Sequence, residues 1–135
     1  MKHLLDVNAL IALAHQAHVH HTRLSRWYLS VKPTTTALCT CAITELGFVR
    51  VAVQIGLQSN VPTARKALAR LKRSGQIPFE LLDDALGVEH LPTFANTPKK
   101  ITDGHLLQLA ESHGAHLATL DSGIPKATLI PALEV

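Results

Sequence analysis

The sequence lacks the features of disulfide-rich, zinc-binding, membrane-spanning and secreted proteins. It has only 2 cysteines in 135 residues, too few for a framework of disulfides. Cys39 and Cys41, two residues apart, are expected to be small buried residues, because two thiols alone do not make a zinc site. No apolar run reaches the roughly 20 residues of a membrane span, and the first residues lack the apolar stretch of a secretory signal. We therefore expect a soluble, cytoplasmic protein.

Aromatic and charged residues are also scarce. Three Phe, one Tyr and one Trp are too few for an extended surface on which nucleic-acid bases stack, so Trp27 and Tyr28 are expected to pack a helix. Charged residues make up 17% of the chain and hydrophobic residues 47%, which is typical of a globular protein. This length predicts a single domain spanning residues 1–135.

Strand and helix patterns alternate along the chain. Strands are predicted at 2–6, 37–39, 116–120 and 127–130. Helices are predicted at 7–14, 22–31, 40–54, 63–73 and 103–113. Prolines interrupt residues 77–98, for which no regular element is predicted. The alternation indicates an α/β fold with a mainly parallel sheet of four to five strands, covered by helices on both faces.

Four acidic residues adjoin apolar runs at the edges of these elements: Asp6, Glu45, Asp103 and Asp121. Isolated buried carboxylates are costly and are normally paired or bound to a metal. Asp6 ends one predicted strand and Asp121 follows another, and parallel sheets bind ligands at the carboxyl ends of their strands. Each acid alone is explained as a cap, turn or surface residue. Together they predict one acidic pocket that holds a divalent cation for phosphate chemistry.

Three polar residues lie next to these acids. Asn8 follows Asp6 by two residues and is suited to holding a water or a carboxylate. Thr102 is expected to cap the helix whose first turn carries an acid, which the helix dipole favours. Thr119 precedes Asp121 by two residues and lies on the same face of a strand. These spacings orient oxygen ligands for Mg²⁺ or Mn²⁺, which usually retain several waters.

Basic residues surround the predicted pocket. The formal net charge is +3, and the acids of the pocket account for much of the negative charge. Residues 65–73 hold five cations on a predicted amphipathic helix, which is either a solvated surface or a clamp that guides RNA. The candidate RNA-contacting residues are Arg50, Arg65, Arg70, Arg73, Lys99 and Lys100.

Four histidines, His15, His18, His20 and His21, cluster between the first two predicted helices. Their spacing matches no standard zinc site. The favoured interpretation is a solvated connection near the mouth of the pocket. Contact with RNA and binding of a metal ion remain open alternatives.

The ordered motifs resemble those of the PIN domain, and more narrowly the VapC-type toxins of bacterial toxin–antitoxin pairs. The strings that carry the resemblance are Leu-Leu-Asp6-Val-Asn8-Ala-Leu-Ile, Ile-Thr-Glu45, Ile-Thr102-Asp103-Gly-His and Leu-Ala-Thr119-Leu-Asp121. The resemblance covers nearly the whole chain. It implies a three-layer α/β/α sandwich and a ribonuclease that depends on Mg²⁺ or Mn²⁺, as the toxin of a type II toxin–antitoxin system. It also implies a homodimer, and inhibition by a VapB-type antitoxin whose tail occupies the acidic pocket.

The same resemblance assigns roles to residues of this chain. The acidic catalytic set is Asp6, Glu45, Asp103 and Asp121, with Asp6, Asp103 and Asp121 as metal ligands and Asn8, Thr102 and Thr119 as supporting residues. Gly123 stands where many relatives have a further acid, which leaves open whether one or two metal ions bind. Two other functions also remain open: a PIN-type nuclease of housekeeping RNA processing, and a non-catalytic module that keeps the pocket to bind a partner.

Overall fold

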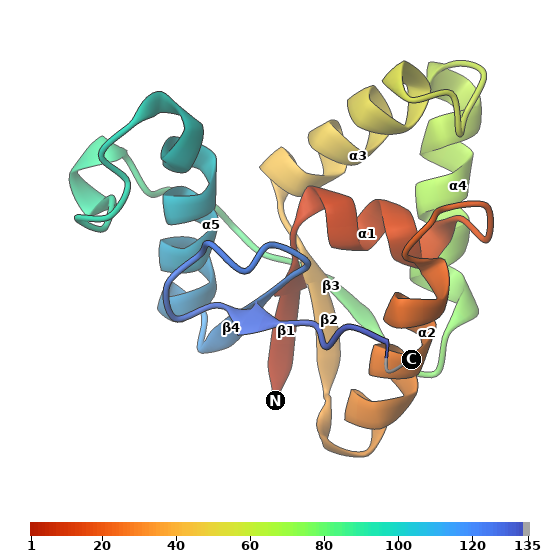
Figure 1. The fold of residues 1–135 in the computed structure, drawn as a ribbon, viewed down its shortest axis with the longest axis horizontal. Helices are drawn as coiled ribbons and strands as arrows, with labels where there is room; N and C mark the ends of the chain where they lie inside the picture. Colours follow the sequence, from red (N-terminus) through yellow and green to blue (C-terminus); the bar gives the residue numbers. More distant parts are fainter. Residues whose placement is uncertain (134–135) are drawn as a thin grey trace.

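Five parallel strands form a single sheet in the computed structural model, which describes residues 1–133 (Figure 1). The strand order is β3-β2-β1-β4-β5, and every neighbouring pair is parallel. The predicted parallel sheet is therefore confirmed. The strands are β1 (Lys2–Leu5), β2 (Ala37–Thr40), β3 (Phe79–Leu81), β4 (Ala115–Thr119) and β5 (Thr128–Leu129).

Helices cover both faces of the sheet. Figure 1 shows α5 on one side and α1 to α4 on the other, which confirms the three-layer α/β/α arrangement. Within residues 1–133, none of the helices has the length and apolar character needed to cross a bilayer. The helices are α1 (Val7–Ala14), α2 (His21–Val31), α3 (Ala42–Gln54), α4 (Val61–Ser74) and α5 (Ile101–Ser112), with short 3₁₀ turns at Lys32–Thr34, Val88–His90 and Pro98–Lys100.

The central strand β1 supplies side chains to the cores on both faces, because successive side chains of a strand point to opposite sides. Leu5 packs in the core with Leu10 of α1 and Phe48 of α3. Leu4 packs in the other core with Leu106 of α5. These side chains are fully or almost fully buried, and each contributes about 1.5–3 kcal/mol by leaving water. The strand that precedes Asp6 is thus fixed from both sides.

Strand β3 lies in the segment 77–98, for which the sequence predicted no regular element. Pro78 precedes the strand, and its carbonyl still accepts a hydrogen bond from the Leu38 N–H at 2.9 Å. Proline is tolerated here because β3 is an edge strand. Three residues beside a proline give too short a pattern to recognise from sequence.

The prediction that Thr102 caps α5 is wrong. The helix begins at Ile101, and Lys100 before it already has helical backbone angles, since the 3₁₀ turn Pro98–Lys100 runs directly into the helix. An N-cap residue needs an extended backbone outside the helix. Thr102 is instead an exposed residue of the first turn, although Asp103 does lie in that turn as predicted.

The histidine cluster is less solvated than predicted. His15 is buried; its Nδ1 donates to the Ile11 carbonyl at 2.8 Å, and its ring stacks on Phe48. Nδ1 of His21 donates to the Ala12 carbonyl at 2.8 Å. Both carbonyls belong to the last turn of α1, whose C=O groups have no partner within the helix. These two histidines therefore complete the end of α1.

Candidate active site

Asp6 lies between the carboxyl end of β1 and the first turn of α1. Its Oδ1 accepts a hydrogen bond from the Ala9 N–H at 2.8 Å, so Asp6 is the N-cap of α1. Its Oδ2 accepts a hydrogen bond from the hydroxyl of Thr119, the last residue of the neighbouring strand β4. The carboxylate is thus held by a helix and by an adjacent strand.

Thr119 links two of the predicted acids. It is completely buried, and its hydroxyl donates to Asp6 while accepting a hydrogen bond from the Asp121 N–H at 2.9 Å. Asp121 itself is exposed in the turn after β4. Its Oδ1 accepts from the Gly123 N–H at 2.8 Å. Asp121 is therefore the most solvated of the four acids.

Three of the acids act on one another electrostatically. Burial raises the pKa of Asp6, and the negative charges of Asp103 and Asp121 raise it further, against the hydrogen bonds from Thr119 and Ala9 that lower it. Burial also raises the pKa of Asp103, as does the charge of Asp121. A carboxylate whose charge raises the pKa of another acid lies close to that acid. The structure thus brings Asp6, Asp103 and Asp121 together at the carboxyl edge of the sheet.

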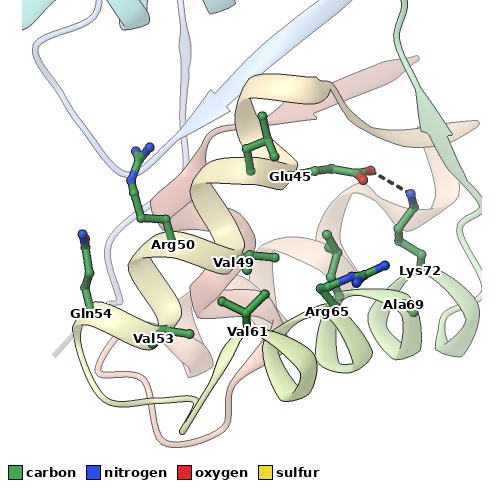
Figure 2. A pocket seen from close by; sticks show the side chains of 11 residues that line it. Glu45, Val49, Arg50, Val53, Gln54, Val61, Arg65, Ala69 and Lys72 are labelled. Atoms are coloured by element: carbon green, nitrogen blue, oxygen red, sulfur yellow. Dashed lines mark hydrogen bonds and ion pairs between the residues drawn. The ribbon is translucent and has the colours of Figure 1, made fainter.

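Glu45 lies in the first turn of α3, but its contacts are with other residues. Its Oε2 accepts a hydrogen bond from the Thr40 hydroxyl at 2.5 Å. The same oxygen forms an ion pair with Lys72 Nζ at 2.7 Å (Figure 2). Thr40 ends β2 and is fully buried, whereas Lys72 reaches across from α4. The acid is therefore held from a strand and from a second helix.

Sequence reasoning missed both partners of Glu45. Thr40 ends β2 at the same edge of the sheet at which Thr119 ends β4, so a hydroxyl at the end of a second buried strand was a usable signal. Lys72 follows the buried Leu68 by four residues, which places it on the same face of α4. This spacing distinguishes Lys72 from the cations on the exposed face of the helix.

The predicted RNA-contacting residues fall in three places. Arg50 and Arg65 line a groove of about 660 Å³ between α3 and α4, with Glu45 and Lys72 also in its lining. Figure 2 shows Val49, Val53 and Val61 along the same groove. Of the remaining cations, two are exposed on α4 and two are exposed just before α5, namely Arg70, Arg73, Lys99 and Lys100.

The supporting residues Asn8 and Thr102 are exposed. Asn8 lies in the first turn of α1, directly after the Asp6 cap. Thr102 lies beside Asp103 in the first turn of α5. Their predicted roles remain predictions, whereas the hydroxyl of Thr119 has a defined partner in Asp6.

A second acid–base pair, also missed from sequence, lies beside Asp103. His105 of α5 contacts Asp84 through Nε2 and Oδ2 at 2.5 Å. Burial opposes ionisation of Asp84, but hydrogen bonds from His105 and from the Leu86 N–H lower the pKa of Asp84 overall. At Gly104, a Cβ would lie only 2.6 Å from the Cβ of Ala95. The segment between β3 and α5 is therefore packed tightly on the first turns of α5.

Comparison with known proteins agrees with this architecture. The family model of the PIN domain matches residues 3–128. The chain belongs to the PIN domain family. This PIN domain is 37% identical to ribonuclease VapC38 of Mycobacterium tuberculosis over 124 residues, covering 90% of this chain and 86% of the relative. It is 36% identical to ribonuclease VapC29 of the same species over 136 residues, covering 95% and 96% of the two chains.

The fold also matches a solved structure of a toxin of this type. The crystal structure of M. tuberculosis VapC20, described as a sarcin–ricin loop cleaving toxin, aligns with a TM-score of 0.66. The alignment covers 96% of this PIN domain and 99% of the VapC20 chain at 12% identity. At that identity the match supports the shared fold alone. The identification as a VapC-type PIN domain rests on the family model and the more similar relatives.

The donor set of this PIN domain fits a hard divalent cation in chemical type. Asp6, Asp103 and Asp121 offer carboxylate oxygens, and burial raises the pKa of the first two, with the charge of Asp121 raising both further. No three His, Cys, Asp or Glu side chains within residues 1–133 converge closely enough to enclose an ion. Mg²⁺ commonly binds through one or two carboxylates and several waters, so the arrangement suits that mode of binding.

Proposed function

We propose that this PIN domain is an endoribonuclease that depends on Mg²⁺ or Mn²⁺ and acts in the cytoplasm as the toxin of a type II toxin–antitoxin pair. The observation that carries the proposal is the coupled acidic set. Burial raises the pKa of Asp6 and of Asp103 at the carboxyl edge of a parallel sheet, and the charge of Asp121 raises both further. The names of the relatives as ribonucleases support RNA as the substrate.

In the proposed reaction, a water attacks phosphorus and the bond to one bridging oxygen breaks. Glu45 accepts a proton from the water, and the leaving oxygen takes up a proton from solvent. Asp6, Asp103 and Asp121 would hold the cation, with Thr119 orienting Asp6 through its hydroxyl. A bound cation would acidify the attacking water and neutralise the charge that grows on the phosphoryl oxygens.

The proposed partner is a VapB-type antitoxin whose tail occupies the acidic pocket. The groove between α3 and α4 supports this idea, because it ends at Glu45 and combines the aliphatic Val49 and Val53 with the cations Arg50 and Arg65. Such a surface suits an amphipathic segment with acidic groups. We further propose that the protein is a homodimer, as the family implies.

Cleavage of RNA by variants of the acidic set tests the proposed activity. Asp6→Asn and Asp103→Asn keep the size of each side chain but remove its charge. We expect each to lower the cleavage rate by about 100-fold or more in Mg²⁺, and EDTA to abolish cleavage by the unmodified protein. The matched control is Asp83→Asn, an exposed acid outside the set, which should cleave at the normal rate. Normal cleavage by either active-site variant would show that the pocket is assigned wrongly.

Induced expression in a bacterial host tests the toxin assignment separately. The unmodified protein should arrest growth, and Asp6→Asn should not. Co-expression with the small reading frame adjacent to the gene should restore growth if that frame encodes the antitoxin. Normal growth with an enzyme that cleaves RNA in vitro would favour a housekeeping nuclease instead.

A further inference from the structure

Lys72 differs from the other cations of its helix. Arg65, Lys66, Arg70 and Arg73 are exposed, whereas the side chain of Lys72 is only 29% exposed and its Nζ lies 2.7 Å from Glu45 Oε2. Figure 2 shows Lys72 extending from α4 toward the first turn of α3. The orientation of this ammonium is therefore defined by one acid of the proposed active site.

The carboxylate of Glu45 is restrained from two sides. The hydroxyl of Thr40, at the end of β2, donates to Oε2 at 2.5 Å, and Lys72 contacts the same oxygen. Two donors on one oxygen limit rotation of the carboxylate and leave Oε1 to other partners.

A purely structural role explains this arrangement less well. Ion pairs that retain solvent contact contribute little to stability, and both side chains of this pair are more than one quarter exposed. Lys72 also occupies a poor position for a general RNA contact, because its charge is directed at Glu45 and the exposed cations of α4 are better placed to meet phosphates.

We infer that Lys72 is a positioning residue for RNA hydrolysis. Together with Thr40 it orients the Glu45 carboxylate, so that Oε1 receives the proton of the attacking water. This inference rests on the proposed nuclease activity and adds to it a residue on α4. It also means that α3 and α4 must keep their relative position for the acid to be aligned.

Steady-state cleavage of a short single-stranded RNA in Mg²⁺ tests the inference. Lys72→Met should lower kcat by about tenfold or more, because a misplaced acid loses its alignment with the substrate, and should leave KM unchanged. Lys72→Arg keeps the charge and should recover most of kcat. Arg26→Met, which removes an exposed cation from α2, should leave both constants unchanged.

A double-mutant cycle with Glu45→Gln separates positioning from substrate contact. If Lys72 acts only through Glu45, adding Lys72→Met to Glu45→Gln should lower kcat no further. Multiplicative losses of kcat, or a raised KM with a weaker salt dependence in Lys72→Met, would overturn the inference and identify an RNA contact instead. Thermal melts of all variants verify folding, and Lys72→Gln replaces Lys72→Met if that variant does not fold.

The cleavage assay also shows which of the two proposals fails. If the unmodified protein leaves RNA intact in both Mg²⁺ and Mn²⁺, the proposed function is wrong. If the unmodified protein cleaves RNA and Lys72→Met has normal kcat and KM, the nuclease activity stands and only the role of Lys72 is wrong.

Discussion

Single hydroxyl groups hold two of the four acids in this protein. Thr119 donates to Asp6, and Thr40 donates to Glu45. Each threonine is the last residue of a buried strand, so its side chain lies where the strand meets the ligand edge of the sheet. A hydroxyl has rotational freedom and can donate to an acid without adding charge. The strand ends thus orient carboxylates without neutralising them.

Replacing Thr119 by Val tests the importance of this contact. The change keeps the shape of the side chain but removes the donor to Asp6 and the acceptor for the Asp121 N–H. We expect a loss of about 1–3 kcal/mol in the free energy of unfolding and a fall in RNA cleavage. Urea denaturation and a cleavage assay check both effects. Thr128→Val on the neighbouring strand β5 is the control, and an equal effect there would show that the hydroxyl of Thr119 has no special role.

At the scale of elements, the start of α5 differs from the start of α4 in how its N–H groups are satisfied. Asn60 caps α4 by accepting from the Thr63 N–H at 2.9 Å. The cap position of α5 is Lys100, which has no side-chain cap bond. A 3₁₀ turn leads into α5 instead. The first turn of α4 is therefore capped by a side chain, whereas α5 continues a backbone turn that precedes it.

Two alanine substitutions distinguish these helix starts. Asn60→Ala should lower the free energy of unfolding by about 1 kcal/mol, because a cap is lost. Thr102→Ala should change it by less than about 0.5 kcal/mol, as for other exposed residues without a special contact. Chemical denaturation of both variants measures the difference. If Thr102→Ala lowered the free energy of unfolding as much as Asn60→Ala does, Thr102 would act as the helix cap that the sequence predicted.

The elements also show what sequence reasoning can reach. Leu4 and Leu5 identify a strand buried on both faces, and the acid that follows must then lie at the ligand edge. Strand β3 escaped prediction because three residues after Pro78 give no recognisable period. The partners of Glu45 escaped because Thr40 and Lys72 meet it through the crossing of three elements. Spacing along one element is readable, whereas a contact between elements depends on their packing.

At the scale of the whole molecule, a buried histidine sets a limit on stability in acid. Neither ring nitrogen of His3 has a hydrogen-bond partner within residues 1–133, and the ring packs edge-on against Trp27. Burial lowers the pKa of His3, and the charges of His116 and of the N-terminus lower it further. Because the unfolded chain binds this proton more readily, acidification favours unfolding.

The pH dependence of unfolding checks this effect in His3→Phe. The folded pKa of His3 is depressed below its unfolded value near 6.5. The unmodified protein should therefore lose stability as pH falls below about 6.5. The His3→Phe variant should lose less stability on acidification. The difference in free energy of unfolding between the variant and the unmodified protein should therefore favour the variant more at pH 5.5 than at pH 8. An advantage that does not change with pH would show that His3 does not titrate differently in the two states.

Divalent cations should stabilise the folded protein as a whole. The raised pKa of Asp6 and of Asp103 means that their charges oppose folding at neutral pH. A cation that binds only the native state adds about 2.7 kcal/mol at a concentration of roughly 100 times its Kd. Mg²⁺ should therefore raise the melting temperature, and Asp6→Asn should reduce that rise. An identical rise in the variant would place the binding site elsewhere.

The order of the strands along the chain determines when the contacts of Asp6 can form during synthesis. The central strand β1 is translated first, but Thr119, which orients Asp6, comes 113 residues later. At about 5–20 residues per second, a ribosome takes roughly 6–23 seconds to cover that interval. A nascent or truncated chain that lacks β4 holds the Asp6 carboxylate only through the Ala9 N–H of α1. A chain that ends before β4 also lacks Asp121, so the proposed metal site of an unfinished chain is incomplete.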